Sequence, residues 1–327
     1  MVVVDPACSR TDSCEQWFQP VRKTAAAGAA RWITVVALLS TVAVSSRAQA
    51  DLTPPGQPRT PRWVGHFTVF AANGLVGGLT AGIVQELRGG SFQDGFSRGF
   101  LGGALIYLGK RVTVGKWAGA GFAGREVAAI GTSVVRNASA AEPSLARIDL
   151  PLGPLPARLG ITVDDSRDLR LRLDIVSAAW LLYGLLEPRF ELDVGEALSS
   201  GVPVFRAVGG SVLERGQPAL GVAVARNIFL SDPTASGGPV GTTPDPALRQ
   251  TLHHERVHVL QQDFFLAAWS EPLTNAVFQR VAPGRWVPAH LAVDGLWWVM
   301  PSLRRWIYSP QDAYRFPTEL EADFLAR

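Results

Sequence analysis

A His-Glu-x-x-His pattern at residues 254–258 constrains the fold of this chain more than any other feature of its sequence. Residues 252–262 contain no Gly or Pro and place apolar side chains at helical spacing, so we expect a helix there. Residues four apart lie on one face of a helix, which lets His254 and His258 offer imidazole nitrogens to one zinc ion. Glu255 flanks the position that a metal-bound water would occupy. The pattern therefore predicts two metal ligands and a general base on one helix.

Other polar residues lie beside this pattern. His253 is one position out of phase with His258, so we interpret it as a neighbour of the site and not as a ligand. Gln261 and Gln262 lie one turn beyond His258, where they can hold its second ring nitrogen or face solvent.

The third ligand that a catalytic zinc site needs has to come from another part of the chain. Residues 317–326 begin with Pro, as helices often do, and bring three carboxylates within five residues: Glu319, Glu321 and Asp323. Acidic residues in the first turn of a helix also complement its dipole, so the run has an ordinary structural interpretation as well.

Taken together, these two segments resemble a known family. The pattern Glu-x-Glu-Ala-Asp-x-x-Ala at residues 319–326, downstream of His-Glu-x-x-His, is similar to the gluzincin arrangement of CaaX prenyl endopeptidase and HtpX-type membrane peptidases. The resemblance implies that Glu319 is the third zinc ligand, with Glu321 as the alternative, and that Asp323 orients a ligand histidine.

A second resemblance covers residues 221–262. The segment Val-Ala-Val-Ala-Arg-Asn-Ile-Phe-Leu at residues 222–230, a loop and the metal helix are similar to the zincin domain associated with extracellular contractile injection systems. In zincins the strand before the metal helix forms the edge on which an extended substrate lies. The resemblance implies that residues 224–230 form that edge here.

Metal-assisted hydrolysis is the chemistry that these residues would carry out. Zinc lowers the pKa of a bound water to about 7, Glu255 accepts the proton, and the hydroxide attacks a carbonyl polarised by the ion. Glu255 then returns the proton to the leaving amine. A donor to the oxyanion is also expected, and the candidates are His290, Tyr308 and Tyr314.

Residues 22–50 have the features of a secretory signal. Basic residues precede an uncharged apolar run at 32–44, and a small-x-small cleavage site at 48–50 precedes Asp51. The run is shorter than the roughly 20 residues that a membrane span needs. We therefore expect cleavage and export to the periplasm or envelope, with an uncleaved anchor as the alternative.

Two uncharged segments within residues 67–109 have glycine at every fourth position: Gly74, Gly78 and Gly82 in the first, and Gly99 and Gly103 in the second. Glycines along one side of a helix let a second backbone approach closely, so we expect a helical hairpin. This hairpin can be buried in protein, lie at a membrane surface or insert, although its flanking charges oppose the positive-inside tendency.

Residues 145–231 change to period-two alternation, which predicts half-buried strands in an antiparallel sheet. In residues 169–175, Leu and Ile alternate with Arg and Asp, and residues 190–194 alternate in a similar way. We expect the last strand of this region to run over residues 222–230.

Charge and cysteine counts exclude other classes of protein. Residues 1–50 hold five of the 31 Lys and Arg and three of the 28 Asp and Glu, which leaves 26 against 25. That balance gives no electrostatic case for a nucleic-acid partner. The two cysteines, Cys8 and Cys14, both lie near the N-terminus, so any metal has to be held by His and carboxylate.

These patterns predict an α+β fold in which an antiparallel β region precedes a zincin-like helical metal-binding region and follows a Gly-rich helical hairpin. The expected parts are an N-terminal extension and signal peptide (1–50), a Pro-rich spacer and hairpin (51–130), a β-rich region (145–231) and the metal-binding region (232–327). The expected function is that of an exported zinc metallopeptidase acting on a peptide or protein. The alternative is a non-catalytic envelope binding or assembly protein with a structural or vestigial zinc site.

Overall fold

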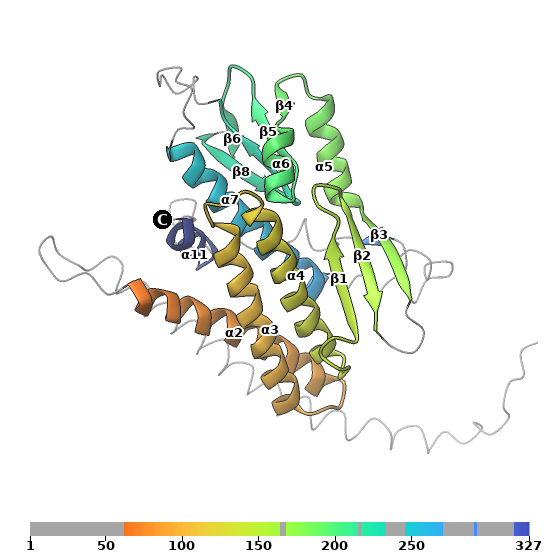
Figure 1. Ribbon diagram of the computed structural model, residues 1–327. Coiled ribbons are helices and arrows are strands. Elements are labelled where there is room, and N and C mark those ends of the chain that lie inside the picture. Colours follow the sequence, from red (N-terminus) through yellow and green to blue (C-terminus); the bar gives the residue numbers. More distant parts are fainter. Residues whose placement is uncertain are drawn as a thin grey trace, which may run out of the picture. The chain divides into compact units, whose positions relative to one another are not determined.

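The computed structural model is of α+β class, as predicted (Figure 1). A helical region is followed by two small sheets, a long helix and a C-terminal helix. The structure describes residues 62–163, 168–214, 217–232, 246–270, 291–292 and 317–326. The predicted signal peptide and its cleavage site lie outside these residues.

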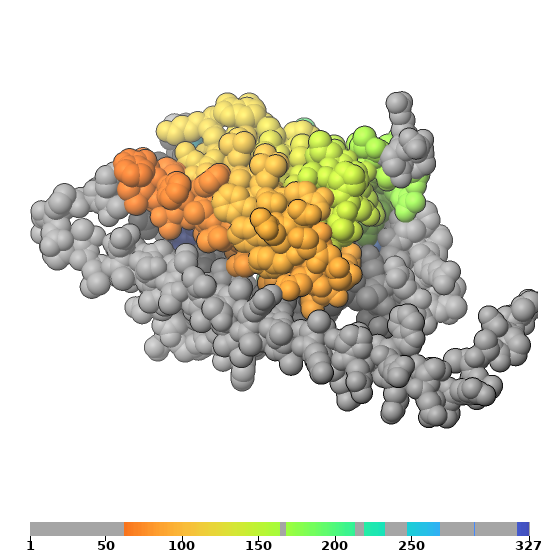
Figure 2. All heavy atoms as spheres, turned by 90° about the horizontal axis from the view of Figure 1, so that it is seen from below, coloured from red at the N-terminus to blue at the C-terminus, as the bar shows by residue number. Residues whose placement is uncertain are grey.

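Helices α2 (Arg62–Leu87) and α3 (Phe92–Thr113) form a hairpin. Gly89, in the turn, has a φ of 84°, which glycine adopts without strain. Ser91 caps α3, because its side chain accepts a hydrogen bond from the backbone N–H of Asp94 at 3.3 Å. Figure 2 shows this hairpin, in orange, at the surface of the described part of the chain.

The glycines of α2 serve two kinds of close packing. Gly74, Gly78 and Gly82 make room for phenylalanine rings of α3, because a methyl group at each would meet a ring carbon within 3.0 Å. Those rings belong to Phe92, Phe96 and Phe100. The two backbones approach each other at Gly77, where a methyl group would lie 2.5 Å from the carbonyl oxygen of Gly99.

Helix α4 (Ala120–Ser139) packs on α3 through a second set of glycines. A methyl group on Gly102 would lie 2.7 Å from the carbonyl oxygen of Gly131, and one on Gly109 would lie 2.5 Å from that of Gly124. Glycines on two sides of α3 therefore hold it between α2 and α4.

The first sheet has the strand order β1-β2-β3-β10. β1, β2 and β3 pair antiparallel, whereas β10 runs parallel to β3. The strands are β1 (Arg147–Pro151), β2 (Ala157–Thr162), β3 (Leu169–Asp174) and β10 (Leu291–Ala292).

Strand β3 is half-buried, as predicted, but its buried side is the charged one. Leu169, Leu171 and Leu173 are 65, 59 and 42% exposed. Arg172 and Asp174, on the opposite face, are each 2% exposed. Alternation in the sequence thus located the two faces of the strand without indicating which one is buried.

Ion pairs account for the buried charges of this sheet. Asp149 on β1 contacts Arg136 of α4 and lies 3.4 Å from Arg147 and 3.8 Å from Arg172. Burial opposes ionisation of Asp149, but the charges of Arg136 and Arg147 outweigh it and lower the pKa of this carboxyl to about 2. The charged face of the sheet is therefore fastened to α4 by fully ionised groups.

The second sheet has the order β4-β5-β9-β8. The prediction of a wholly antiparallel β region was wrong, because β5 and β9 run parallel and helices α5 (Ile175–Leu186) and α6 (Val194–Ser200) interrupt the strands. The strands are β4 (Phe190–Leu192), β5 (Val204–Ala207), β8 (Gly221–Val224) and β9 (Asn227–Leu230). A separate two-stranded ribbon consists of β6 (Val212–Glu214) and β7 (Gln217–Ala219).

The single strand predicted over residues 222–230 is a hairpin of β8 and β9. Ala225 and Arg226 form its turn with φ values of 45° and 67°, a conformation that side chains other than Gly, Asn and Asp seldom adopt. β9 lies between β5 and β8. Of the two strands of this hairpin, β8 therefore lies at an edge of the sheet and β9 does not, so residues 224–230 do not form the edge that the resemblance implied.

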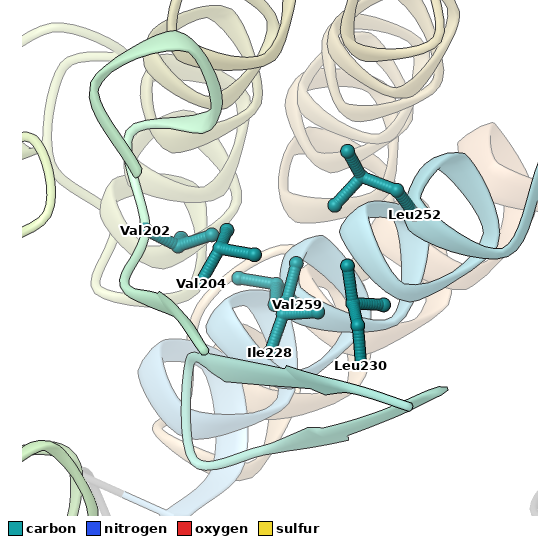
Figure 3. Packing of buried hydrophobic residues seen from close by; sticks show 6 residues of the cluster. All are labelled: Val202, Val204, Ile228, Leu230, Leu252 and Val259. Atoms are coloured by element: carbon teal, nitrogen blue, oxygen red, sulfur yellow. The ribbon is translucent and has the colours of Figure 1, made fainter. Parts of the chain in front are cut away.

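Helix α7 (Pro246–Phe265) packs on the second sheet across the main apolar core and continues into a π-helical turn, η2 (Leu266–Ser270). Figure 3 shows the buried side chains of this core: Val202, Val204, Ile228, Leu230, Leu252 and Val259. Helix α11 (Pro317–Ala326) packs on α7 through a smaller cluster formed by Val257, Ala322 and Leu325.

A chain of buried charges joins the first sheet to α7 and α4. Asp174 of β3 lies 2.6 Å from Arg226, which also contacts Asp263 of α7. The second oxygen of Asp263 lies 3.2 Å from Nε of Arg125 on α4. These pairs hold Arg226 in its positive-φ turn.

The close approach at Gly77 leads to a first prediction. We expect Gly77→Ala to lower the free energy of unfolding by roughly 1–3 kcal/mol. The energetic cost of the overlap between the new methyl group and the Gly99 carbonyl exceeds the energy that alanine gains through its higher helix propensity. Urea denaturation measures the change. Gly210→Ala is the matched control, since a methyl group there meets nothing within 4 Å. Equal losses in the two variants would contradict backbone contact at Gly77.

Glu126 on α4 leads to a second prediction. Its Oε1 is buried and accepts no hydrogen bond within the described residues. Burial, assisted by the charge of Asp263 and opposed by that of Arg125, raises its pKa from 4.5 to about 7. Because the folded-state pKa is raised, the stability associated with this group is present below pH 4.5 and is lost as the pH rises through about 7.

We therefore expect Glu126→Gln to raise the free energy of unfolding by roughly 1–3 kcal/mol at pH 8 and to change it little at about pH 5. Urea unfolding at the two pH values measures this. A gain of equal size at both would show that ionisation of Glu126 is not the cause.

Candidate metal centre

Helix α7 places His254 and His258 one turn apart on the same face. Their rings lie 4.6 Å apart at an interplanar angle of 77°, and the two Nε2 atoms are 2.9 Å apart. Both side chains are only partly exposed. Two ring nitrogens thus point at one location beside the helix.

Helix α11 brings Glu319 to the same location. Its Oε2 lies 3.0 Å from Nε2 of His258 and 3.3 Å from Nε2 of His254. The ligand atoms of His254, His258 and Glu319 all lie within 4.8 Å of one another, and they form the one such group of three His, Cys, Asp or Glu found in the described part of the chain. This His₂Glu set can hold a metal ion, and nitrogen and carboxylate donors of this kind suit zinc.

The second nitrogen of each histidine also has a partner. Nδ1 of His254 lies 3.1 Å from Oδ1 of Asp323, and Nδ1 of His258 lies 2.8 Å from Oε1 of Gln261. Partners of this kind fix the tautomer and ring orientation of a metal ligand. Of the two glutamines left open by the sequence, Gln261 therefore holds His258, whereas Gln262 donates to the Ala223 carbonyl at 3.1 Å.

Glu321, the alternative ligand, faces away from the two histidines. Its carboxylate accepts hydrogen bonds from Lys110 at 2.8 and 2.9 Å, from Asn73 at 2.7 Å and from Gln261 at 2.9 Å. Burial opposes ionisation, but the charge of Lys110 and these donors outweigh it and lower the pKa of Glu321. The geometry therefore favours Glu319 as the third ligand.

Glu255 of α7 is buried and lies beside β8. A methyl group on Gly221, the first residue of β8, would lie 2.7 Å from a carbon of Thr251, 3.0 Å from one of Leu230 and 3.3 Å from Cγ of Glu255. The glycine thus lets this part of α7 approach the edge strand closely.

The local charges act on His258. Burial opposes its protonation, but the hydrogen bond and charge of Glu319, with the charge of Glu255, outweigh burial and raise the pKa of His258 to about 9. A metal ion that binds at neutral pH therefore displaces a proton from this ring.

His253 is not part of the group. Burial, with the charges of Arg256, Arg249 and Lys116, lowers its pKa to about 4, so it is neutral at pH 7. Arg256 itself hydrogen-bonds to Ser200 and Glu196, both at 2.9 Å, and so fixes α7 on α6.

The candidate oxyanion donors His290, Tyr308 and Tyr314 lie outside the described residues. Asn73 and Lys110, which sequence reasoning did not single out, belong to the Gly-rich hairpin. Asn73 interrupts an apolar stretch of the first glycine-rich segment, and Lys110 directly follows the second.

No protein-family profile, curated protein or solved structure matches this chain. What the coordinates establish is a His254–His258–Glu319 group that is compatible with a His-Glu-x-x-His metal site.

Metal content gives the third prediction. We expect the purified protein to bind about one zinc ion per chain, and His258→Ala and Glu319→Ala each to weaken binding by more than tenfold through loss of a ligand. Elemental analysis and titration against a chelating dye measure this. His253→Ala is the control and should bind zinc as the wild type does. Unchanged affinity in His258→Ala would contradict the site.

Proposed function

We propose that the protein is an exported zinc metallopeptidase of gluzincin type. The observation that carries the proposal is the convergence of His254, His258 and Glu319, two ligands from one helix and a third that follows His258 by 61 residues. A catalytic zinc site has three protein ligands and an open position, whereas a structural site is closed by four. The three described ligands match the number that a catalytic site has.

The residues have distinct parts in the proposed reaction. His254, His258 and Glu319 would hold the ion, while Asp323 and Gln261 keep the two imidazoles with Nε2 toward it. A zinc ion held there would supply a water of lowered pKa, about 7, and would polarise a substrate carbonyl. Glu255 would act as the general base toward the attacking water and as the proton donor to the leaving amine.

The edge strand β8 supports a peptide as the substrate. β8 pairs only with β9 among the described strands, and Gln262 donates to one carbonyl of its other edge, that of Ala223. The remaining backbone groups of that edge can pair with an extended chain. Gly221 of this strand lies against Glu255. A peptide added to β8 would therefore pass close to the proposed general base.

Membrane association through residues 67–109 belongs to the same proposal. α2 is, among the described helices, the one that is long and apolar enough to cross a bilayer. Trp63, Phe67 and Leu87, near its two ends, are largely exposed. Recovery of the native protein entirely in the soluble fraction would count against membrane association.

A non-catalytic binding protein is the second candidate. The exposed leucines of β3 continue into α5, where Leu182, Leu185 and Leu186 are also exposed, and apolar surface of this kind suits a partner. In that case the metal group would stabilise the fold without hydrolysing a substrate.

The fourth prediction separates the two candidates. Glu255→Gln should keep its zinc and lose peptide hydrolysis by roughly 10²–10⁴-fold, because the amide cannot accept the proton. Digestion of a peptide mixture, followed by mass spectrometry and metal analysis, measures both properties. Glu191→Gln, which replaces an exposed glutamate of β4, is the control and should hydrolyse peptides as the wild type does. Undiminished hydrolysis by Glu255→Gln would refute the role of the base, and zinc-loaded wild type without any hydrolysis would favour the binding protein.

A further inference from the structure

A buried ammonium group of the hairpin is linked to the metal centre by hydrogen bonds. Nζ of Lys110, on α3, donates to both oxygens of Glu321 and to Oδ1 of Asn73 at 2.8 Å. Asn73, on α2, donates in turn to Glu321 at 2.7 Å. The hairpin thus holds one carboxylate of α11 with a charge and a side-chain amide.

This arrangement determines how the Gln261 amide is oriented. A carboxylate only accepts hydrogen bonds, so the NH₂ group of Gln261 has to face Glu321, to which it donates at 2.9 Å. The amide oxygen then faces Nδ1 of His258 at 2.8 Å. If the amide were reversed, its NH₂ group would face the ring instead.

The amide orientation determines which tautomer of His258 is favoured. An amide oxygen only accepts, so Nδ1 of His258 carries the hydrogen and the lone pair of the neutral ring lies on Nε2. Nε2 is the atom that lies beside His254 and Glu319. Once its Nε2 proton has been displaced, the ring therefore presents a lone pair to the metal ion.

We propose that Lys110 and Asn73 are positioning residues of the metal centre, which hold Glu321 so that Gln261 presents His258 as an Nε2 ligand. This inference rests on the proposed metal site and extends it to the α2–α3 hairpin. The Gly-rich helices would then contribute directly to the affinity for the metal, in addition to packing against their neighbours.

Lys110→Met tests this inference, because it retains most of the side-chain volume and removes the donors. We expect zinc affinity, measured against a chelating dye, to fall by as much as the roughly 10–100-fold that follows when a metal ligand loses its own hydrogen-bond partner. Lys110→Arg should recover part of that loss. Arg125→Met is the matched control. Arg125 and Lys110 are each 4% exposed, and each pairs with a carboxylate, Arg125 with Asp263 of α7 and Lys110 with Glu321 of α11.

A double-mutant cycle separates positioning from general loss of structure. Gln261→Leu should weaken zinc binding about as much as Lys110→Met, and the double variant should lose little more, because both changes interrupt one chain of contacts. Additive losses, or an equal loss in Arg125→Met, would overturn the inference. Gln261→Leu also serves alone if Lys110→Met does not fold.

The outcomes for the wild type and the variant identify which claim has failed. If the wild type binds no zinc, the metal centre itself is refuted, and the positioning role with it. If the wild type binds zinc and folded Lys110→Met binds it equally well, only the role of the hairpin is refuted. The ¹⁵N spectrum of His258 in the zinc-loaded protein gives a second readout, since a protonated Nδ1 and a metal-bound Nε2 are expected in the wild type.

Discussion

The packing of α11 against α7 is the interaction on which the metal centre depends. Ala322 and Leu325 are buried against Val257, which fixes the rotation of α11 about its axis. Glu319 and Asp323 are four residues apart and so share the helix face that meets the two histidines, whereas Glu321 lies on the opposite side. One apolar contact thereby assigns three neighbouring carboxylates to different partners.

Charge inside the fold is the second constraint. Burying an ion is costly unless it is paired and hydrogen-bonded, and the structure meets that condition with pairs that connect separate elements. Asp149 joins β1 to α4, and the Asp174–Arg226–Asp263 chain joins β3 to α7. Because such pairs are directional, they define the position of the sheet on the helices more narrowly than apolar contact alone would.

Parts of the fold and of the site could be predicted from the sequence. Local spacing was sufficient for the helix that carries His254 and His258 and for the Gly-rich hairpin, because a helix converts sequence separation directly into a shared face. The assignment of Glu319 as the third ligand came from a resemblance, and the structure places its carboxylate beside the two imidazole rings.

Other parts depended on contacts that no local pattern records. Alternation in β3 distinguishes two faces, but the buried one is chosen by acids and arginines elsewhere in the chain. The turn at Ala225 and Arg226 lacks Gly and Asn, the residues that usually mark it, so the segment reads as one strand. Lys110 and Asn73 meet Glu321 across 211 and 248 residues of sequence.

Because these contacts join residues that are far apart in the sequence, a related chain would be recognised by several separate segments and not by one motif. A short motif on one helix recurs by chance in many unrelated proteins. In this fold it is accompanied by a glutamine three residues after the second histidine, by the spaced acids of α11, and by an amide and an ammonium within glycine-rich helices. A descendant of the same ancestor should preserve that combination as a set, even where the intervening sequence has diverged beyond alignment.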